Sequence, residues 1–287
     1  MQVKNQHYLR SILFHKIKRC ISLLLLTALA VSVLYPLAWT IMSSIRDPQD
    51  FFQNPWGLPQ KLDFSVYAKV WTDFNVGHAL FNSIRLSTIT VSISLLFTLT
   101  ASFAISRMQW RLSNVALAFL LSGLMIPGHS TIIPLYLSLL PVIESFGAMN
   151  AILVPYIAGT LPISVFIISS YMRSIPDSLE EAAVIDGCNI WQLFYKIIVP
   201  VSLPAIASVT IFNFLSVWNE LMLGLVFLTK NTEQTLPLAM LRFSGRFGTQ
   251  WSETLATVSI AIIPSILVYI VLQEKLIKGM TAGSVKG

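Results

Sequence analysis

Residues 21–45, ISLLLLTALAVSVLYPLAWTIMSSI, contain no Asp, Glu, Lys or Arg and decide the class of fold. An α-helix rising 1.5 Å per residue needs roughly 20 apolar residues to cross about 30 Å of hydrocarbon. Because basic residues at 16–19 precede the run and Ala28-Leu29-Ala30 lies within it, a cleaved signal peptide is an alternative. The run continues well past Ala30, however, which favours a membrane anchor.

Five further runs along the chain are equally free of charged residues. They are residues 86–106, 112–143, 145–172, 197–219 and 254–273. Of the 287 residues, 55% are hydrophobic and 11% are charged, which is more apolar surface than a soluble domain of this size can bury. We therefore predict an all-α, polytopic membrane protein with six transmembrane helices. The third run, which holds Pro127, Gly128 and Pro134, is expected to be the least regular.

The basic residues predict the orientation of these helices. Six spans place both termini on one side of the membrane, and more Lys and Arg lie on that side than on the other. The bias predicts cytoplasmic termini, with residues 46–79 and 229–253 facing outward. We expect a cytoplasmic N-terminal segment (1–19), a six-helix permease domain (20–277) and a cytoplasmic C-terminal tail (278–287). Cys20 and Cys188 would then lie at the cytoplasmic face, where a disulfide is not expected.

Residues 173–199 would form a cytoplasmic loop, and local signals in it predict two short helices. Ser178 and Glu181 have the spacing of a capping box at the start of the first helix. Gly187 would end that helix, and Asn189 would cap the second.

The second helix is predicted to be amphipathic. Ile190, Leu193, Phe194 and Ile197 recur at helical spacing and give it one apolar face. Pro200 and Pro204 would mark the entry to the fifth span. From these residues alone, the helix-turn-helix could press into a partner protein or rest on lipid headgroups as an amphipathic linker, and both readings stay open.

The same loop resembles a known motif. Glu181-Ala182-Ala183, followed by Asp186-Gly187 and by Ile197, Val199 and Pro200, resembles the EAA loop of ATP-binding-cassette importer permeases. The sequence departs from that pattern mildly, since Val199 replaces the usual Leu and Cys188 stands where close relatives often carry Ala.

The resemblance extends over nearly the whole chain and is greatest to the carbohydrate-uptake branch, specifically the maltose-type second permease subunit. Further matching stretches are Tyr35-Pro36-Leu37 with Trp39, Asn82-Ser83, Pro134-Leu135-Tyr136, Trp218-Asn219-Glu220 and residues 279–287. It implies a type I importer permease fold in a bacterial cytoplasmic (inner) membrane. It also implies a homologous permease as heterodimer partner, two ATPase subunits, an extracytoplasmic solute-binding protein and a carbohydrate cargo, expected to be an oligosaccharide.

The resemblance implies two sets of residues that contact the ATPase. The docking set in the loop is Glu180, Glu181, Ala182, Ala183, Asp186, Gly187, Ile190, Phe194, Ile197 and Pro200. The set in the C-terminal tail is Thr281, Ala282, Gly283 and Lys286. A solvated, disordered tail is the alternative for the second set.

A polar stripe in the second span has two possible roles. Thr90, Ser94, Thr98 and Ser102 recur every four residues, and Asn213 lies in the fifth span. Thr90, Ser94, Thr98 and Asn213 are candidates for a translocation path for a hydroxyl-rich solute. Small hydroxyl residues more often let membrane helices approach closely, and we favour that role for the stripe.

Catalytic signatures are missing from the sequence. It contains no G-x-x-x-x-G-K-[ST], no H-E-x-x-H, no C-x-x-C and no G-x-S-x-G. We therefore expect no catalytic residue, no metal site and no cofactor on this chain, with ATP and Mg bound by a separate ATPase.

The alternatives to a permease are a nucleic-acid-binding protein and an ion-driven transporter or channel. The basic residues lie at the ends of apolar runs rather than in one patch, so nucleic acid is not an expected partner. The alternative function is a secondary transporter or channel driven by an ion gradient, which would need paired charges near the bilayer midplane.

Overall fold

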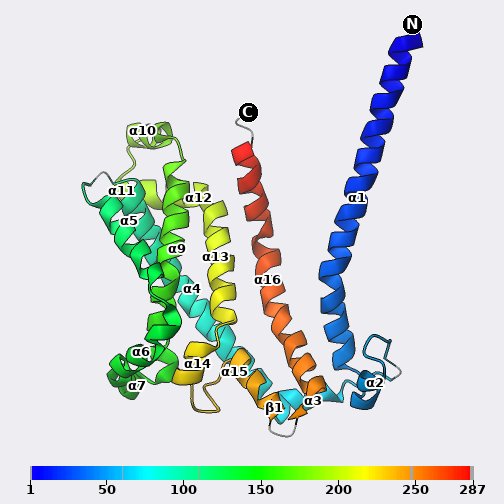
Figure 1. The fold of residues 1–287 in the computed structure, drawn as a ribbon. Coiled ribbons are helices and arrows are strands. Elements are labelled where there is room, and N and C mark those ends of the chain that lie inside the picture. Colours follow the sequence, from blue (N-terminus) through cyan, green and yellow to red (C-terminus); the bar gives the residue numbers. More distant parts are fainter. Residues whose placement is uncertain (1, 60, 109, 246–247, 285–287) are drawn as a thin grey trace. The chain divides into compact units, whose positions relative to one another are not determined.

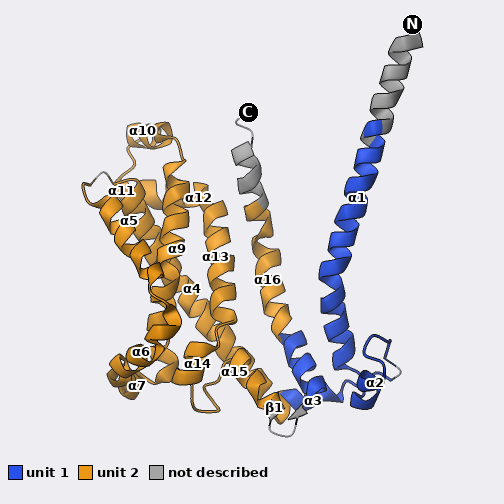
Figure 2. Ribbon diagram, viewed as in Figure 1, with its two compact units in different colours: residues 1–70, 247–260 blue, residues 71–246, 261–287 orange. Residues whose placement is uncertain are grey.

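The computed structural model describes residues 2–59, 61–108, 110–245 and 248–284 (Figure 1). Its regular structure is almost entirely helical, which confirms the predicted all-α class. The described residues also include two short strands, β1 (Ser244–Gly245) and β2 (Gly248–Thr249). The chain divides into two compact units, residues 1–70 with 247–260 and residues 71–246 with 261–287 (Figure 2).

The first unit contains α1 (Gln2–Ser44), α2 (Pro48–Gln53), most of α3 (Ser65–Thr72) and the first turns of α16 (Trp251–Ser284). The buried Arg46 organises the turn after α1 by donating to Asp50 Oδ2 at 2.9 Å and to the carbonyls of Asn54 and Gly57 at 2.8 and 2.9 Å. Lys69 Nζ donates to Glu253 Oε1 at 2.7 Å. This ion pair ties α3 to the start of α16.

The second unit is built around α4 (Val76–Ser106), α9 (Leu153–Arg173) and α13 (Leu203–Trp218), which pack against one another. The helices that surround this core, in chain order, are α5 (Ser113–Ser122), η1 (Gly123–Met125), η2 (Gly128–Thr131), α6 (Ile132–Ser138), α7 (Leu140–Phe146), α8 (Ala148–Ala151), α10 (Asp177–Ile185), α11 (Ile190–Gln192), η3 (Leu193–Ile198), α12 (Val199–Val201), α14 (Met222–Phe227), α15 (Leu236–Met240) and η4 (Leu241–Phe243).

Four described helices are long and apolar enough to cross a membrane unbroken. They are Lys16–Ser44, Val76–Ser106, Ala148–Arg173 and Trp251–Leu276. Two further segments reach the required length only as bent pairs, Ser113–Met125 with Gly128–Ser138 and Ile190–Val201 with Leu203–Trp218. The described residues therefore contain four to six candidate spans, and the predicted number of six requires that each bent pair be one span.

Proline explains both bends. The first pair turns by 82° where Ile126, the residue before Pro127, leaves the helical region with ψ 119°. The third apolar run is therefore the irregular one, as its sequence predicts. The second pair turns by 72° at Ser202, two residues before Pro204, which has no N–H to donate to the carbonyl of Pro200.

Candidate functional site

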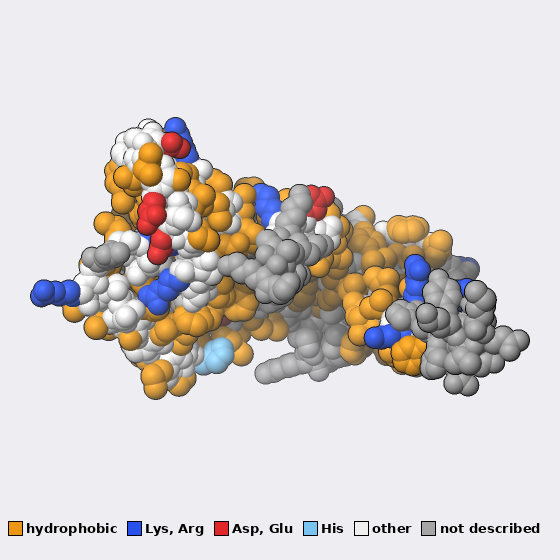
Figure 3. Space-filling model, turned by 90° about the horizontal axis from the view of Figure 1, so that it is seen from above, with side chains coloured by type: hydrophobic (Ala, Val, Ile, Leu, Met, Phe, Trp, Pro, Cys, Tyr) orange, Lys and Arg blue, Asp and Glu red, His pale blue; other side chains and the backbone are white. Residues whose placement is uncertain are grey.

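The segment between α9 and α13 forms α10, a turn, and a second helical stretch made of α11, η3 and α12. Figure 1 shows α10 beyond the ends of α5 and α9, at the end of the second unit opposite α6 and α7. Acidic and basic side chains gather over this end in the view from above (Figure 3). This end of the second unit lies beyond the long apolar helices and exposes charged side chains.

The start of α10 corrects one prediction. The helix begins at Asp177, directly after Pro176, whose ψ of 137° is extended, and no side chain caps it. Ser178 already lies inside the helix, so the predicted capping box with Glu181 is wrong. Asp177 and Glu180 occupy the first turn instead, where negative charge interacts favourably with the helix dipole.

The turn after α10 is set by Gly187, as predicted. Its φ of +79° lies in the left-handed region, which costs other residues roughly 1–2 kcal/mol. The N–H of Gly187 donates to the Val184 carbonyl at 3.0 Å, and the N–H of Cys188 donates to the Ala183 carbonyl at 2.9 Å. These two bonds form a Schellman motif, which satisfies carbonyls at the end of α10.

Asn189 caps the second helical stretch, which confirms its predicted role. Its Oδ1 accepts from the N–H of Gln192 at 2.9 Å, and Gln192 Oε1 accepts from the N–H of Asn189 at 3.0 Å. The stretch then passes through the π-helical η3, where Leu193 and Ile198 are buried. Both ends of the turn are thus fixed by local hydrogen bonds.

The predicted docking set divides by exposure. Glu181, Ala182, Asp186, Gly187, Ile190 and Pro200 are exposed, Glu180, Phe194 and Ile197 are half-buried, and Ala183 is buried. Ala183 packs in a core of this chain that includes Ile168 and Met172. Because adjacent residues on a helix point about 100° apart, only Ala182 of the alanine pair is open to a partner. A contact of Ala183 with an ATPase stays a prediction.

Arg107, one of the basic residues expected on the side of the termini, holds this segment in place. Arg107 follows the last turn of α4, and its side chain is 6% exposed. Its Nη1 donates to Asp177 Oδ1 at 2.7 Å, and its Nε lies 3.0 Å from Glu180 Oε1. Its Nη2 donates to the carbonyls of Met172 and Ile175. No sequence motif marks these partners, since they lie about 70 residues further along the chain.

Burial has the larger effect on the charge of Glu180 in this pair. Burial raises the pKa of Glu180 above its ordinary value, whereas the charge of Arg107 opposes that rise. The side chain of Glu180 is 21% exposed. The removal of water from the carboxylate therefore outweighs its attraction to the guanidinium.

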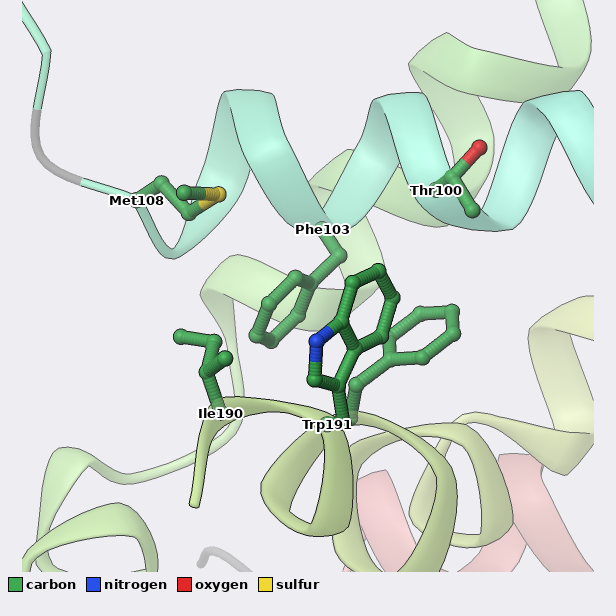
Figure 4. Close-up of a pocket in the computed structure, with 6 residues that line it drawn as sticks. Thr100, Phe103, Met108, Ile190 and Trp191 are labelled. Atoms are coloured by element: carbon green, nitrogen blue, oxygen red, sulfur yellow. The ribbon is translucent and has the colours of Figure 1, made fainter.

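A second contact joins α4 to the same segment. The rings of Phe103 and Phe194 lie 5.1 Å apart. They line an apolar pocket of about 160 Å³ together with Thr100, Met108, Ile190 and Trp191 (Figure 4). Thus α4 contacts α10 through Arg107 and η3 through Phe103.

The translocation candidates lie in helix contacts. Thr90, Ser94, Thr98 and Asn213 are fully buried in the described structure. Ser94 Oγ lies 2.7 Å from Thr160 Oγ1, and Asn213 Nδ2 donates to Ser164 Oγ at 2.9 Å. These small side chains let α4, α9 and α13 pack closely, as favoured above. A role in translocation stays a prediction.

The C-terminal candidates are only partly described. Thr281, Ala282 and Gly283 belong to the last turns of α16, and Lys286 lies outside the described residues. Their contact with an ATPase stays a prediction. Cys20 and Cys188 are free thiols, and the described part of the chain holds no cluster of three His, Cys, Asp or Glu residues that could bind a metal ion.

Comparison with known proteins gives the class to which this chain belongs. Residues 94–282 match the family of binding-protein-dependent transport system inner membrane components. The match covers more than half of the chain, which therefore belongs to this family.

Individual relatives agree over most of their length. A putative ABC transporter permease protein, ORF2 of Caldicellulosiruptor sp., is 35% identical and covers 88% of this chain and 91% of its own. The trehalose/maltose transport system permease protein MalG of Thermococcus litoralis is 30% identical over 94% of this chain and 98% of its own. The crystal structure of a bacterial ABC transporter that imports the acidic polysaccharide alginate superposes with a TM-score of 0.71 at 25% identity, covering 90% of this chain and 96% of that one.

Proposed function

We propose that this chain is one permease subunit of an ATP-driven, binding-protein-dependent importer, and that its cargo is a carbohydrate, most simply an oligosaccharide. Membership of the transport family supports the first part. The second part is supported by relatives named for trehalose and maltose and for diacetylchitobiose, and by the likeness to the alginate importer. The chain forms the translocation path together with a homologous permease.

The proposed topology is six spans with both termini in the cytoplasm, in a bacterial inner membrane. Each bent pair then counts as one span, with its bend at Pro127 or Ser202. The excess of Lys and Arg on the side of the termini supports this orientation. Residues 20–277 form the permease domain in this proposal, and the segment 173–199 lies inside the cell.

The coupling proposal is that the end of α10 docks into an ATPase subunit, and the exposure of Ile185 is the observation that carries it. Ile185 is 85% exposed and Val184 63% exposed, which is unusual for large apolar side chains. The acids Glu181 and Asp186 flank them and are also exposed. Anionic lipid headgroups would repel these acids, so a protein groove with basic groups fits this surface better than the membrane does.

The partners follow from this role. Two ATPase subunits bind ATP and Mg, and one of them receives α10 while the other receives the loop of the partner permease. Thr281, Ala282, Gly283 and Lys286 make a further contact at the ATPase interface. A solute-binding protein delivers cargo on the outer side. This chain itself contributes no catalytic group, cofactor or metal ligand.

Co-purification tests the docking. The tagged chain, extracted in mild detergent, is expected to bring down an ATPase chain, and Glu181→Lys is expected to abolish this by reversing the charge that meets the groove. Glu144→Lys is the matched control, because Glu144 is also an exposed acid but lies on α7, at the opposite end of the second unit. Capture of the ATPase by both variants alike would count against the docking surface. Its absence from the wild-type preparation would favour an ion-driven transporter or channel.

The topology has its own test. In a Cys20→Ser variant, Cys188 is the remaining thiol. A membrane-impermeant maleimide is expected to label it in inside-out vesicles and to leave it unlabelled in sealed cells. Labelling of sealed cells alone would place the loop outside the cell and end the proposal.

The cargo is tested with the assembled complex and its solute-binding protein. Maltose, trehalose, diacetylchitobiose and an alginate oligosaccharide are compared for stimulation of ATP hydrolysis, with an amino acid such as methionine as the control. Stimulation by one of the sugars supports the carbohydrate assignment. Stimulation by the amino acid alone overturns it and leaves the permease assignment standing.

A further inference from the structure

We propose that Arg107 is the positioning residue that fixes the coupling segment (residues 173–199) to α4, so that movement of α10 reaches α4 and α9 together. This inference deepens the proposed function and rests on it. It concerns how a movement of α10 at the ATPase reaches α4 and α9, whichever sugar is carried. The chain itself connects α10 to α9 through residues 174–176 and to α11 through residues 186–189, and it does not connect α10 directly to α4.

The contacts of Arg107 span three elements. Its guanidinium donates to the carbonyls of Met172, in the last turn of α9, and Ile175, in the connection to α10. The same group donates to Asp177 at 2.7 Å and lies 3.0 Å from Glu180, both in the first turn of α10. A planar guanidinium presents its donors in a fixed fork, which suits several acceptors held at once. Arg107 therefore joins the ends of α4 and α9 to the start of α10.

The position of Arg107 makes this tie rigid. Its side chain is 6% exposed, so solvent competes little for its donors. Phe103, one turn earlier on α4, packs against Phe194 and so ties α4 to η3. Further along α4, Ser94 and Ser102 form hydrogen bonds to Thr160 and to the carbonyl of Val165 on α9, and the two helices pack against each other. Coupling of this kind requires contacts that are continuous from the docking surface to the moving helices.

Lysine could not replace this group. It carries the same charge, but its ammonium is a single point with three donors and no fork. It can meet either the acids of α10 or the carbonyls at the end of α9, and it cannot hold both. A role in charge alone would be rescued by lysine, whereas a role in positioning would be rescued only in part.

Cys188 reports on the tie, because it is partly buried against the core that includes Ala183 and Leu193. In Cys20→Ser membranes prepared as inside-out vesicles, the labelling rate with N-ethylmaleimide measures how often the segment opens. Arg107→Gln is expected to raise this rate by about tenfold, and Arg107→Lys by about threefold. Arg111→Gln is the matched control, since Arg111 is an exposed arginine four residues away, and its rate is expected to stay unchanged.

Asp177→Ala breaks the same tie from the side of α10 and tests it if the Arg107 variants fail to accumulate. Asp177 is 85% exposed, so this change should not prevent folding. It is expected to raise the labelling rate by about threefold alone, and by much less when added to Arg107→Gln, because both changes break the same tie. Equal effects of Asp177→Ala in both backgrounds would show that Asp177 acts without Arg107.

Function provides the readout that a purely structural role would not move. In the assembled importer, Arg107→Gln is expected to retain ATP hydrolysis while losing uptake of radiolabelled maltose, trehalose and diacetylchitobiose, whichever the wild type carries. A parallel fall in both activities, or a labelling rate equal to that of the wild type, would overturn the positioning role. Such a result leaves the proposed function intact, because capture of the ATPase and its loss in Glu181→Lys are independent of Arg107.

Discussion

Replacing Gly187 by valine should break the turn between α10 and α11. The left-handed backbone at this position costs a residue with a side chain roughly 1–2 kcal/mol, and a β-branched residue lies at the upper end. No atom lies within 4 Å of where a Cβ would stand, so the cost comes from the backbone and not from crowding. A cost of about 2 kcal/mol raises the population of the open turn about 30-fold, at about 1.4 kcal/mol per factor of ten.

The thiol of Cys188, which follows this turn, measures the effect directly. Gly187→Val in a Cys20→Ser background is expected to increase the maleimide labelling rate about 30-fold and to abolish uptake by the assembled importer. Gly187→Asn is the matched control, because asparagine tolerates the left-handed region and should raise the rate by no more than about threefold. Equal labelling of the two variants would refute the reasoning, since it would show that the bulk of a side chain matters here and the sign of φ does not.

Three further predictions concern other parts of the chain. Arg46→Ala should destabilise the turn after α1 by about 2–4 kcal/mol, because it removes the buried guanidinium that binds Asp50 and the carbonyls of Asn54 and Gly57; a lower unfolding temperature of the detergent-purified protein checks this, and Arg46→Lys should restore little of it. Ser94→Leu should overpack the contact between α4 and α9 at a cost of about 1–3 kcal/mol, whereas Ser94→Ala should cost about 0.6 kcal/mol. The unfolding temperature should therefore fall further in Ser94→Leu than in Ser94→Ala. Because burial raises the pKa of Glu180, the contribution of its protonation to stability is present below the ordinary value of 4.5 and is lost as pH rises through the raised value. In Glu180→Gln, the maleimide labelling rate of Cys188 should therefore be no higher than in the wild type at pH 7. A ratio of the variant and wild-type labelling rates that does not change between pH 5 and 7 would contradict the shift.

The coupling segment shows how far local sequence reaches. Gly187 and Asn189 are predicted correctly because their roles depend on hydrogen bonds to residues within five positions. Ser178 fails as a cap even though the spacing to Glu181 fits, because Pro176 sets the start of the helix two residues earlier than the motif requires. Composition alone does not distinguish these two starting points.

The membrane helices show the same division. Charge-free runs identify the apolar segments, and Pro127 and Pro204 mark where two of them bend. The size of each bend, 82° and 72°, is given only by the tertiary structure. Whether such a segment crosses once or turns back is therefore not contained in its length or composition.

By itself, the sequence determined the all-helical membrane class, the residues of the turn at Gly187 and the family resemblance of the loop. These properties arise from hydropathy and from backbone preferences, which act between residues close together in the chain. Only the tertiary structure decided that Ala183 faces its own core and that Arg107 contacts Asp177 and Glu180. Helices α4 and α10 are far apart in sequence, and their ends meet only because α4 packs along α9, so no local pattern records the contact.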